Sequence, residues 1–186
     1  MGRVIVDKSM SLDGFIAGPH DEIEPLHEWL ADNGAVAGRV LLEELLARVG
    51  AVVMGRRTFS MIDGPEGWLG PDGTPFALPV VVLTHQRGEP VTKGQTAFSF
   101  ATSGIEDAVT QAREAAGDKD ISVMGADAGR QALQAGLVDE VVIHLVPVLL
   151  GNGIRMFEHL DRHVHLEATA VLQDPHVTHH RYRVVR

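Results

Sequence analysis

The sequence predicts an α/β protein: a three-layer α/β/α sandwich whose central sheet is mixed, mostly parallel, and ends in an antiparallel hairpin. Up to residue 136, short apolar runs typical of strands buried on both faces alternate with helical patterns. Near the end, apolar and polar residues alternate over 164–172 and 177–185, with a turn at Asp174-Pro175 between them. The first observation predicts parallel strands joined by helices, and the second predicts the closing hairpin.

Length and composition favour a single domain over residues 1–186. The chain is 45% hydrophobic and 22% charged, and 186 residues are enough to bury a substantial core. Its net charge of −9 argues against a nucleic acid or an anionic membrane surface as the main partner. It contains no cysteine, which excludes disulfides and thiolate metal sites, and no apolar run approaches the roughly 18 residues of a membrane-spanning helix. A cytoplasmic protein is therefore expected.

The N-terminal third is predicted to contain one strand and one helix. Residues 3–10 are rich in Val and Ile and predict a central strand. Turn signals follow at Asp13-Gly14 and Gly18-Pro19, and 21–32 form a short amphipathic piece. Apolar residues at helical spacing then predict a helix over Val36–Arg48, which Gly50 ends.

Residues 51–59 predict a strand that turns directly into a helix and binds an anion. An apolar run over 51–54 is followed by Gly55, Arg56, Arg57 and Thr58. The start of a helix presents free backbone N–H groups at its positive end, and guanidinium groups match phosphate oxygens. The alternative for this segment is a strand end with two solvated arginines.

The middle of the chain continues the alternation of strands and helices. After a Gly- and Pro-rich loop over 64–79, residues 80–84 predict a buried strand, and 97–100 predict a short one. A capping-box pattern, Ser103-x-x-Glu106, begins a helix that runs to about Ala116. A strand over 121–124, a glycine-containing corner over 125–129 and a helix over 130–135 follow, with Gly136 as the helix cap.

The C-terminal third is predicted to add one long strand and the hairpin. Residues 139–150 form an apolar run that Pro147 interrupts, which indicates a bulge or an edge position. A turn follows at 151–153. The apolar strand over 141–150 and the closing hairpin offer an edge through which the chain is expected to form a two-fold homodimer.

Histidines suggest a metal site, but their arrangement favours another interpretation. Of the ten, His163 and His165 share a strand face, while His176, His179 and His180 cluster in the last strand. Zinc needs three or four convergent ligands, whereas histidines on strand faces near an exposed edge are usually solvated. No metal is therefore expected. His144, inside an apolar strand, is predicted to be a hydrogen-bonded core residue.

Three predicted strands end in polar or glycine-containing corners: 55–58, 84–87 and 125–129. In open α/β sheets, ligands bind outside the carboxyl ends of the strands, so these corners suit a nucleotide with several phosphates. No Gly-x-Gly-x-x-Gly motif follows the first strand, which argues against a Rossmann domain.

An ordered set of short motifs runs through almost the whole chain. They are Ser11-Leu12-Asp13-Gly14-Phe15-Ile16-Ala17, Met54-Gly55-Arg56-Arg57-Thr58-Phe59, Val82-Leu83-Thr84, Val123-Met124-Gly125-Ala126, Gly136-Leu137-Val138-Asp139-Glu140 and Pro147-Val148-Leu149-Leu150-Gly151-Asn152-Gly153. Together they resemble the dihydrofolate reductase-like fold, in the branch related to the C-terminal reductase domain of the bifunctional riboflavin-biosynthesis enzyme.

This resemblance implies an NADPH-dependent reductase of a pterin-like or aminopyrimidine-like small molecule. It also implies positions for the cofactor. Phosphates would be bound by Gly55, Arg56, Arg57 and Thr58, and the adenosine would lie beside Leu83, Thr84, His85 and Arg87. The pyrophosphate would be bound by Gly125, Ala126, Asp127, Ala128 and Gly129. The nicotinamide would lie beside Ser9, Ile16 and Ala17.

Two acids are candidates for the proton donor that a reductase needs. The resemblance aligns Asp13 best, at a position that in the riboflavin branch is as much structural as catalytic. Glu28 lies near the position that carries a carboxylate in reductases of dihydrofolate. Ala126 stands where the family usually has a second glycine. This substitution and the presence of several acids around Glu28 favour an alternative, a nucleotide-binding or sensing module of the same fold without turnover.

Overall fold

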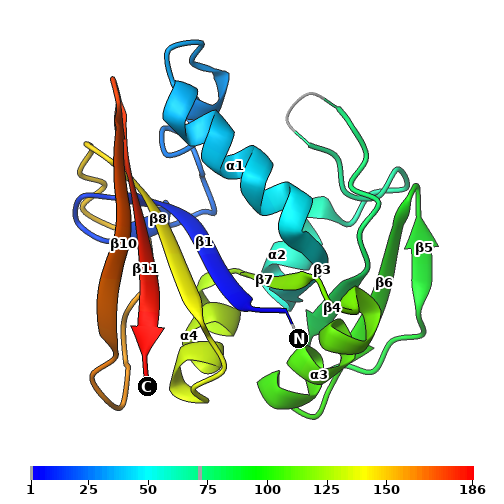
Figure 1. Ribbon diagram of the computed structural model, residues 1–186. Helices are drawn as coiled ribbons and strands as arrows, with labels where there is room; N and C mark the ends of the chain where they lie inside the picture. Colours follow the sequence, from blue (N-terminus) through cyan, green and yellow to red (C-terminus); the bar gives the residue numbers. More distant parts are fainter. Residues whose placement is uncertain (1, 71–72) are drawn as a thin grey trace.

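A computed structural model describes residues 2–70 and 73–186, and nine strands of this part form one sheet (Figure 1). In spatial order the strands are β10 (His165–Asp174), β11 (Val177–Val185), β8 (Glu140–Val146), β1 (Val4–Ser11), β7 (Asp120–Met124), β3 (Val49–Gly55), β4 (Val80–Leu83), β6 (Thr96–Ala101) and β5 (Val91–Lys93). The neighbours from β8 to β6 are parallel. β11 and β10 are antiparallel at one edge, and β5 is antiparallel at the other. The predicted mixed sheet with a closing hairpin is confirmed.

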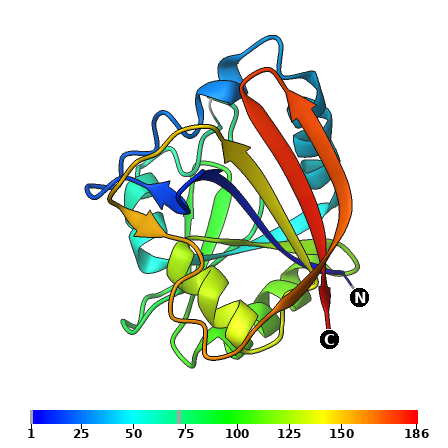
Figure 2. The same ribbon diagram turned by 90° about the vertical axis from the view of Figure 1, so that its left-hand side faces the viewer.

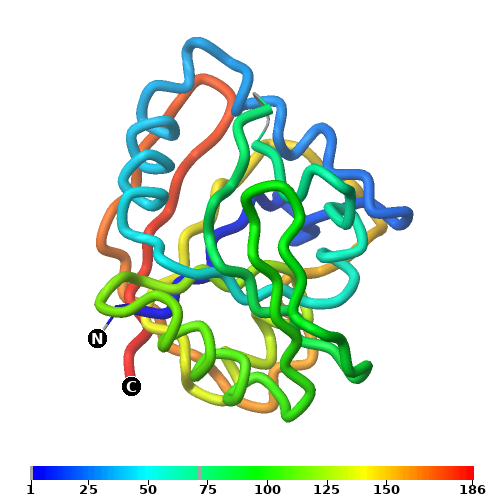
Figure 3. Tube along the Cα trace, turned by 90° about the vertical axis from the view of Figure 1, so that its right-hand side faces the viewer, coloured from blue at the N-terminus to red at the C-terminus, as the bar shows by residue number. Residues whose placement is uncertain are grey.

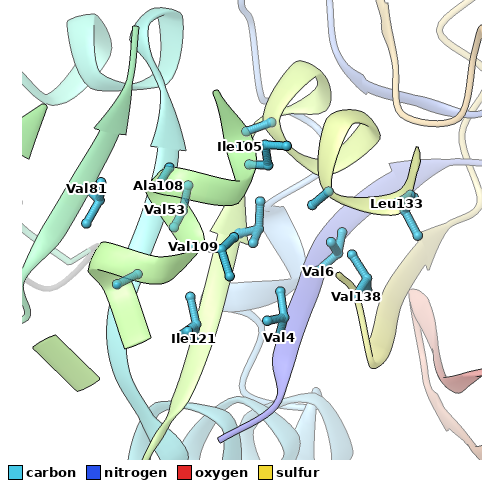
Figure 4. Close-up of a cluster of buried hydrophobic side chains, with 14 of the residues drawn as sticks. Val4, Val6, Val53, Val81, Ile105, Ala108, Val109, Ile121, Leu133 and Val138 are labelled. Carbon is cyan, nitrogen blue, oxygen red and sulfur yellow. The ribbon is translucent and has the colours of Figure 1, made fainter. Parts of the chain in front are cut away.

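Helices cover both faces of the sheet, as predicted. On one face, α1 (Val36–Arg48) and the short α2 (Arg56–Ile62) bury Leu41, Leu45 and Phe59 against strand residues such as Val52. On the other face, α3 (Ile105–Ala116) and α4 (Ala126–Gln134) pack against the sheet. Figure 4 shows part of this second layer, with helix residues Ile105, Val109 and Leu133 over Val6 and other strand valines.

The structure corrects three local predictions. Helix α3 begins at Ile105 after Gly104, which has φ 100° and no side-chain cap, so the Ser103–Glu106 capping box does not form. Helix α4 begins at Ala126 rather than at 130, because the glycine corner turns directly into the helix. Strand β8 ends at Val146, since Pro147 has no backbone N–H with which to continue the ladder.

Several short elements were not predicted. β5 has only three residues, too few to show an alternating pattern. β2 (Phe15–Ala17) and β9 (Ile154–Arg155) form a separate two-stranded sheet, which joins segments almost 140 residues apart in the sequence. The 3-10 helix η1 (Glu28–Ala31) places Trp29 in the core.

The N-terminal end of α1 lies beside the hairpin. Both Figure 2 and Figure 3 show α1 along the closing strands. The contact is specific, because the Asp174 carboxylate at the end of β10 accepts hydrogen bonds from the N–H groups of Ala37 (3.1 Å) and Gly38 (2.7 Å). Within the described residues, no helix is long and apolar enough to cross a membrane.

Candidate functional site

The carboxyl ends of β7, β3 and β4 lie side by side, next to the middle of β1 (Figure 1). The register sets them almost level: Met54 pairs with Met124, and Gly55 pairs with Leu83. On the other side of β7, Val6 pairs with Val123, so Asp7 follows at the same height. The structure therefore brings together the three predicted corners and the middle of the first strand, at Asp7.

Two of these corners touch through a glycine. Gly125 has φ 93°, and a Cβ added there would lie 2.7 Å from Thr58 Oγ1 and 3.9 Å from the Gly55 nitrogen. In contrast, a Cβ at Gly55 would meet no described atom within 4 Å. The β7–α4 corner is thus packed tightly against the β3–α2 corner, while the space beside Gly55 is open to a ligand.

The two corner arginines have different surroundings. Arg57 Nε lies 2.6 Å from Asp21 Oδ1, an ion pair that joins α2 to the loop before η1. The exposed Arg56 guanidinium lies 5.1 Å from the centre of the Phe59 ring, and in the described part of the chain it has no carboxylate partner. Arg56 is therefore the cation at this corner that can bind an incoming anion without breaking an ion pair.

The third corner is the first turn of α4. A helix leaves its first N–H groups without intrahelical partners, which here belong to Ala126 and the residues after it. The Gly129 N–H already donates to the Gly125 carbonyl at 3.0 Å, and the Gly129 Cα packs against Met156. Ala126 lies in the helix and its φ is not positive, so its methyl group does not strain this turn.

Side chains of this first turn have structural contacts. Asp127 pairs with Arg130 and accepts a hydrogen bond from Gln131 Nε2 at 2.7 Å. Ala128 is fully buried in the core between α4 and the sheet. Any contact of this turn with a phosphate would therefore be made mainly by the backbone.

At the end of β4, some of the residues predicted to border the adenosine are buried and others are exposed. Thr84 is buried, and its hydroxyl accepts the Gln86 N–H at 3.1 Å, which holds the chain as it leaves the sheet. Leu83 packs against the core under α3. His85 and Arg87 are exposed just beyond this strand end.

The predicted nicotinamide-side residues lie around the end of β1. The buried Ser9 hydroxyl accepts a hydrogen bond from Trp29 Nε1 at 3.0 Å, which holds η1 against the sheet. Ala17 is buried and pairs with Ile154, and Ile16 packs against the core.

Asp13 anchors two loops. Its carboxylate accepts hydrogen bonds from Ser11 Oγ (2.6 Å) and from the N–H groups of Gly151 (2.8 Å) and Leu150 (3.1 Å). The Ser11 bond foremost, with the two backbone bonds, lowers the pKa of Asp13 to about 2, although desolvation opposes the shift. An acid ionised at neutral pH has no proton to give, so this geometry fits an anchor better than a proton donor. Glu28, the other candidate acid, is exposed on η1.

A buried pair of histidines lies behind the end of β1. The prediction that His144 is a hydrogen-bonded core residue is confirmed, but the prediction that His179 is solvated is wrong. His179 faces inward on β11 because it shares a strand face with the buried Val177, a pattern that the alternating sequence already contained. Within the described residues, no three His, Cys, Asp or Glu side chains converge as metal ligands.

Comparison with known proteins places this fold among reductases. Residues 3–179 match the family model described as the RibD C-terminal domain. A protein from Shewanella sp. PV-4 that was provisionally assigned to riboflavin biosynthesis is 26% identical, with a TM-score of 0.76 and 99% of both chains covered. The comparison with curated proteins gave no match.

Two more distant structures share the fold. One is the diaminohydroxyphosphoribosylaminopyrimidine deaminase/5-amino-6-(5-phosphoribosylamino)uracil reductase of Thermotoga maritima, 16% identical, with a TM-score of 0.69 over 99% of this chain and 57% of that one. The other is dihydrofolate reductase from Enterococcus faecalis in complex with NADP(H), 14% identical, with a TM-score of 0.63 over 100% and 98% of the two chains.

Proposed function

The chain belongs to the RibD C-terminal domain family, and we propose that it is an NADPH-dependent reductase of an aminopyrimidine-like or pterin-like small molecule. The broader class, an oxidoreductase, follows from the family and from the reductases that share its fold. The cofactor and the substrate class are the proposal.

The contact between Gly125 and Thr58 carries the proposal. It brings the first turn of α4 against the start of α2 and leaves the backbone of Gly55 open. Close packing of two helix starts concentrates unpaired N–H groups at one edge of the sheet, an arrangement suited to an anion with more than one phosphate. Arg56 adds a cation with no carboxylate partner among the described residues.

The donor set at this edge fits NADPH. Gly55, Arg56 and Thr58 would bind phosphate oxygens, and the backbone of Ala126 and Asp127 would face the pyrophosphate. Leu83, Thr84, His85 and Arg87 would border the adenosine, with Arg87 available to a 2′-phosphate. Bound NADPH supplies the hydride. Ser9, Ile16 and Ala17 border the end of β1, where the nicotinamide is proposed to lie.

The substrate would lie on the α1/α2 face of the central strands. There Asp7, Ser122 and Met124 are only partly buried, although they lie on central strands, so neither helix covers this part of the sheet completely. The protein's contribution would be to hold the acceptor against the cofactor and to exclude water. The relative from Thermotoga maritima suggests a phosphoribosylaminopyrimidine as the first acceptor to try.

The first experiment is a titration of the purified protein with NADPH and with NADH, followed by thermal shift and by the fluorescence of Trp29 and Trp68. We expect saturable stabilisation that is stronger with NADPH. Oxidation of NADPH is then followed with 5-amino-6-(5-phosphoribosylamino)uracil and with dihydrofolate as acceptors.

The outcomes separate the two candidate functions. Binding with acceptor-dependent oxidation supports the reductase. Binding of NADPH without oxidation by any pterin, pyrimidine or quinone acceptor would instead support a nucleotide-binding or sensing module. Stabilisation by neither nucleotide would contradict the cofactor site at the three corners.

A further inference from the structure

Four side chains form a continuous hydrogen-bonded chain beneath α1. Asp7 Oδ2 lies 3.2 Å from His144 Nε2, His144 Nδ1 lies 2.6 Å from His179 Nδ1, and His179 Nε2 lies 3.0 Å from Asp174 Oδ2. The residues come from β1, β8, β11 and the end of β10. We refer to Asp7, His144, His179 and Asp174 as the Asp–His–His–Asp chain.

The Asp–His–His–Asp chain is shielded from water except at the Asp7 end. The side chains of His144 and His179 are 3% and 0% exposed, and that of Asp7 is 18% exposed. Trp29 packs on both imidazoles, with ring centroids 4.7 and 5.1 Å away. Gly38 of α1 packs against His179, and a Cβ added at Gly38 would lie 2.6 Å from the His179 ring. Asp7 is therefore the end from which a ligand can reach this chain.

Three hydrogen bonds require three protons. If both histidines were neutral and donated from Nε2 to their carboxylates, two bare Nδ1 atoms would face each other at 2.6 Å in a dry site. Burying a polar atom without a hydrogen bond is unfavourable, because the atom loses its bond to water and gains none in return. A proton on His144 Nδ1 removes this conflict, but the contact of His144 Nε2 with Asp7 at 3.2 Å then needs a proton of its own. With all three hydrogen bonds formed, the Asp–His–His–Asp chain therefore holds one proton more than two neutral imidazoles and two carboxylates would.

The surroundings decide where that proton lies. Burial alone would raise the pKa of Asp174, but the N–H groups of Gly38 and Ala37 and the bond from His179 outweigh it and leave the pKa lowered. Burial lowers the pKa of His179. With Asp174 ionised and His179 neutral, His179 donates from Nε2 and accepts at Nδ1. His144 must then donate from Nδ1, which leaves the extra proton between His144 Nε2 and Asp7.

We propose that Asp7 and His144 share the proton that is delivered to the acceptor during reduction, with His179 and Asp174 as positioning residues. This proposal rests on the reductase function proposed above. It names a proton donor that is neither Asp13 nor Glu28. Asp7 is placed for this role, because it lies one residue beyond the Val6–Val123 pair, and its second carboxylate oxygen has no hydrogen-bond partner among the described residues.

The proposed step is balanced. Reduction of a C=N or C=O bond adds the hydride to the carbon, and the electron pair of the double bond moves to the heteroatom. Asp7 gives its proton to that heteroatom and becomes a carboxylate facing the bare His144 Nε2. After the product leaves, water reprotonates the pair through Asp7, while the two inner hydrogen bonds stay intact.

Two further titratable side chains of the described residues interact electrostatically with the Asp–His–His–Asp chain and contribute to the pH dependence of its protonation. They are Lys8 on β1 and His27 before η1; burial lowers the pKa of both. α1 faces the chain with backbone N–H groups. The next histidine, His180, bonds instead to Thr178 and Tyr182 and lies outside the chain, which makes it a matched control.

The first test is independent of turnover: 15N NMR of the imidazole nitrogens in the ligand-free protein. We expect His144 to carry a proton on Nδ1 and His179 to carry one on Nε2 with a bare Nδ1. A bare His144 Nδ1, or a His144 Nε2 that neither carries a proton nor accepts a hydrogen bond, would at neutral pH overturn the proposal, whatever the enzyme does with NADPH.

The second test uses the variants His144→Gln and Asp7→Asn, with His180→Gln as the control. Gln and Asn can keep the hydrogen bonds but hold no mobile proton. We expect kcat with the phosphoribosylaminopyrimidine or dihydrofolate to fall about a hundredfold at neutral pH, within the usual range for loss of a general acid. The Kd of both variants for NADPH should equal that of the wild type. The control His180→Gln should keep both the wild-type kcat and the wild-type Kd. The pH dependence of turnover should differ between His144→Gln and the wild type, because the imidazole that shares the proton with Asp7 is missing.

The failures can be told apart. If the wild-type protein oxidises NADPH but both variants match it, the proton donor lies elsewhere and the reductase function stands. If the wild type oxidises no NADPH, the reductase function fails, and NMR alone decides whether the extra proton exists. A variant that does not fold, as judged by its NMR spectrum, is replaced by His179→Leu, which offers His144 Nδ1 no acceptor, so that loss of the His144 Nδ1 proton is expected.

Discussion

The Gly125 backbone lies directly against the Thr58 hydroxyl, and a Cβ at Gly125 would come within 2.7 Å of Thr58 Oγ1. The first prediction follows from this contact. Gly125→Ala should lower the free energy of unfolding by more than about 1 kcal/mol, because alanine would also have to adopt φ 93°.

Gly55→Ala is the variant to be compared with Gly125→Ala. Gly55 has φ −71°, and its added methyl would meet no described atom, so the fold should remain as stable as the wild type. We expect this variant to bind NADPH more weakly, since the methyl group would occupy the space proposed for a phosphate. Urea unfolding and NADPH titration of both variants check this pair. Unchanged NADPH affinity in Gly55→Ala would argue against the phosphate position.

The second prediction separates the two corner arginines. Arg56→Ala should raise the Kd for NADPH about tenfold or more, because a hydrogen bond to a charged group contributes about 1.5–3 kcal/mol. Arg57→Ala should have a smaller effect, since Arg57 is paired with Asp21. The Arg56→Ala, Arg57→Ala double variant should bind NADPH on the order of a hundredfold more weakly than the wild type.

Two further variants sharpen that experiment. Asp21→Asn frees Arg57 and should tighten NADPH binding, while the exposed Arg183→Ala on β11 should leave it unchanged. Isothermal titration calorimetry measures all of these Kd values. Equal affinities across the set, in folded proteins, would remove the arginines from the cofactor site.

The third prediction concerns pH and Asp13. The folded-state pKa of Asp13 is about 2, below the roughly 3.9 of an unfolded aspartate. Its ionised form therefore stabilises the fold above the unfolded pKa, and this contribution is lost as the pH falls through about 2. Asp13→Asn should be less stable than the wild type at neutral pH, and the difference should shrink on acidification.

Urea unfolding at a series of pH values measures this difference. Glu43→Gln, at an exposed position on α1, is the control and should show no such trend. A constant difference between Asp13→Asn and the wild type would mean that the charge of Asp13 is not what holds the loops together.

The fourth prediction is a homodimer formed through β10. The sequence placed the dimer edge partly in 141–150, but β8 lies between β11 and β1 and has no free edge. β10 is the edge strand, and it exposes Leu166, Val171 and Leu172. We propose that a second copy covers it, which light scattering would show as twice the 20.1 kDa chain mass.

Substitutions test this interface. Val171→Lys with Leu172→Lys should shift the protein toward the monomer, and Leu69→Lys, at an exposed position of another loop, should not. A wild type that stays monomeric at high concentration would rule out the proposed dimer.

The sequence by itself determined most of the long strands and helices and the family of the protein. Apolar runs over residues 51–54 and 80–84 predicted buried strands, because such runs indicate burial on both faces of a strand. The Gly55-Arg56 corner and the Asp13-Gly14 turn were visible because glycine and charge mark chain turns locally. Ordered along the chain, these motifs were enough to predict the fold and a reductase family.

Only the tertiary structure decided which residues meet. The contact of Gly125 with Thr58, the pairing of Arg57 with Asp21 and the joining of His144 to His179 all link segments far apart in the sequence. Such contacts depend on strand order and register, which local patterns do not encode. For the same reason, the hydrogen bonds by which Asp13 joins two loops were not visible in the sequence, where its role was as much structural as catalytic. Asp7 became a candidate proton donor only once β1 lay beside β8.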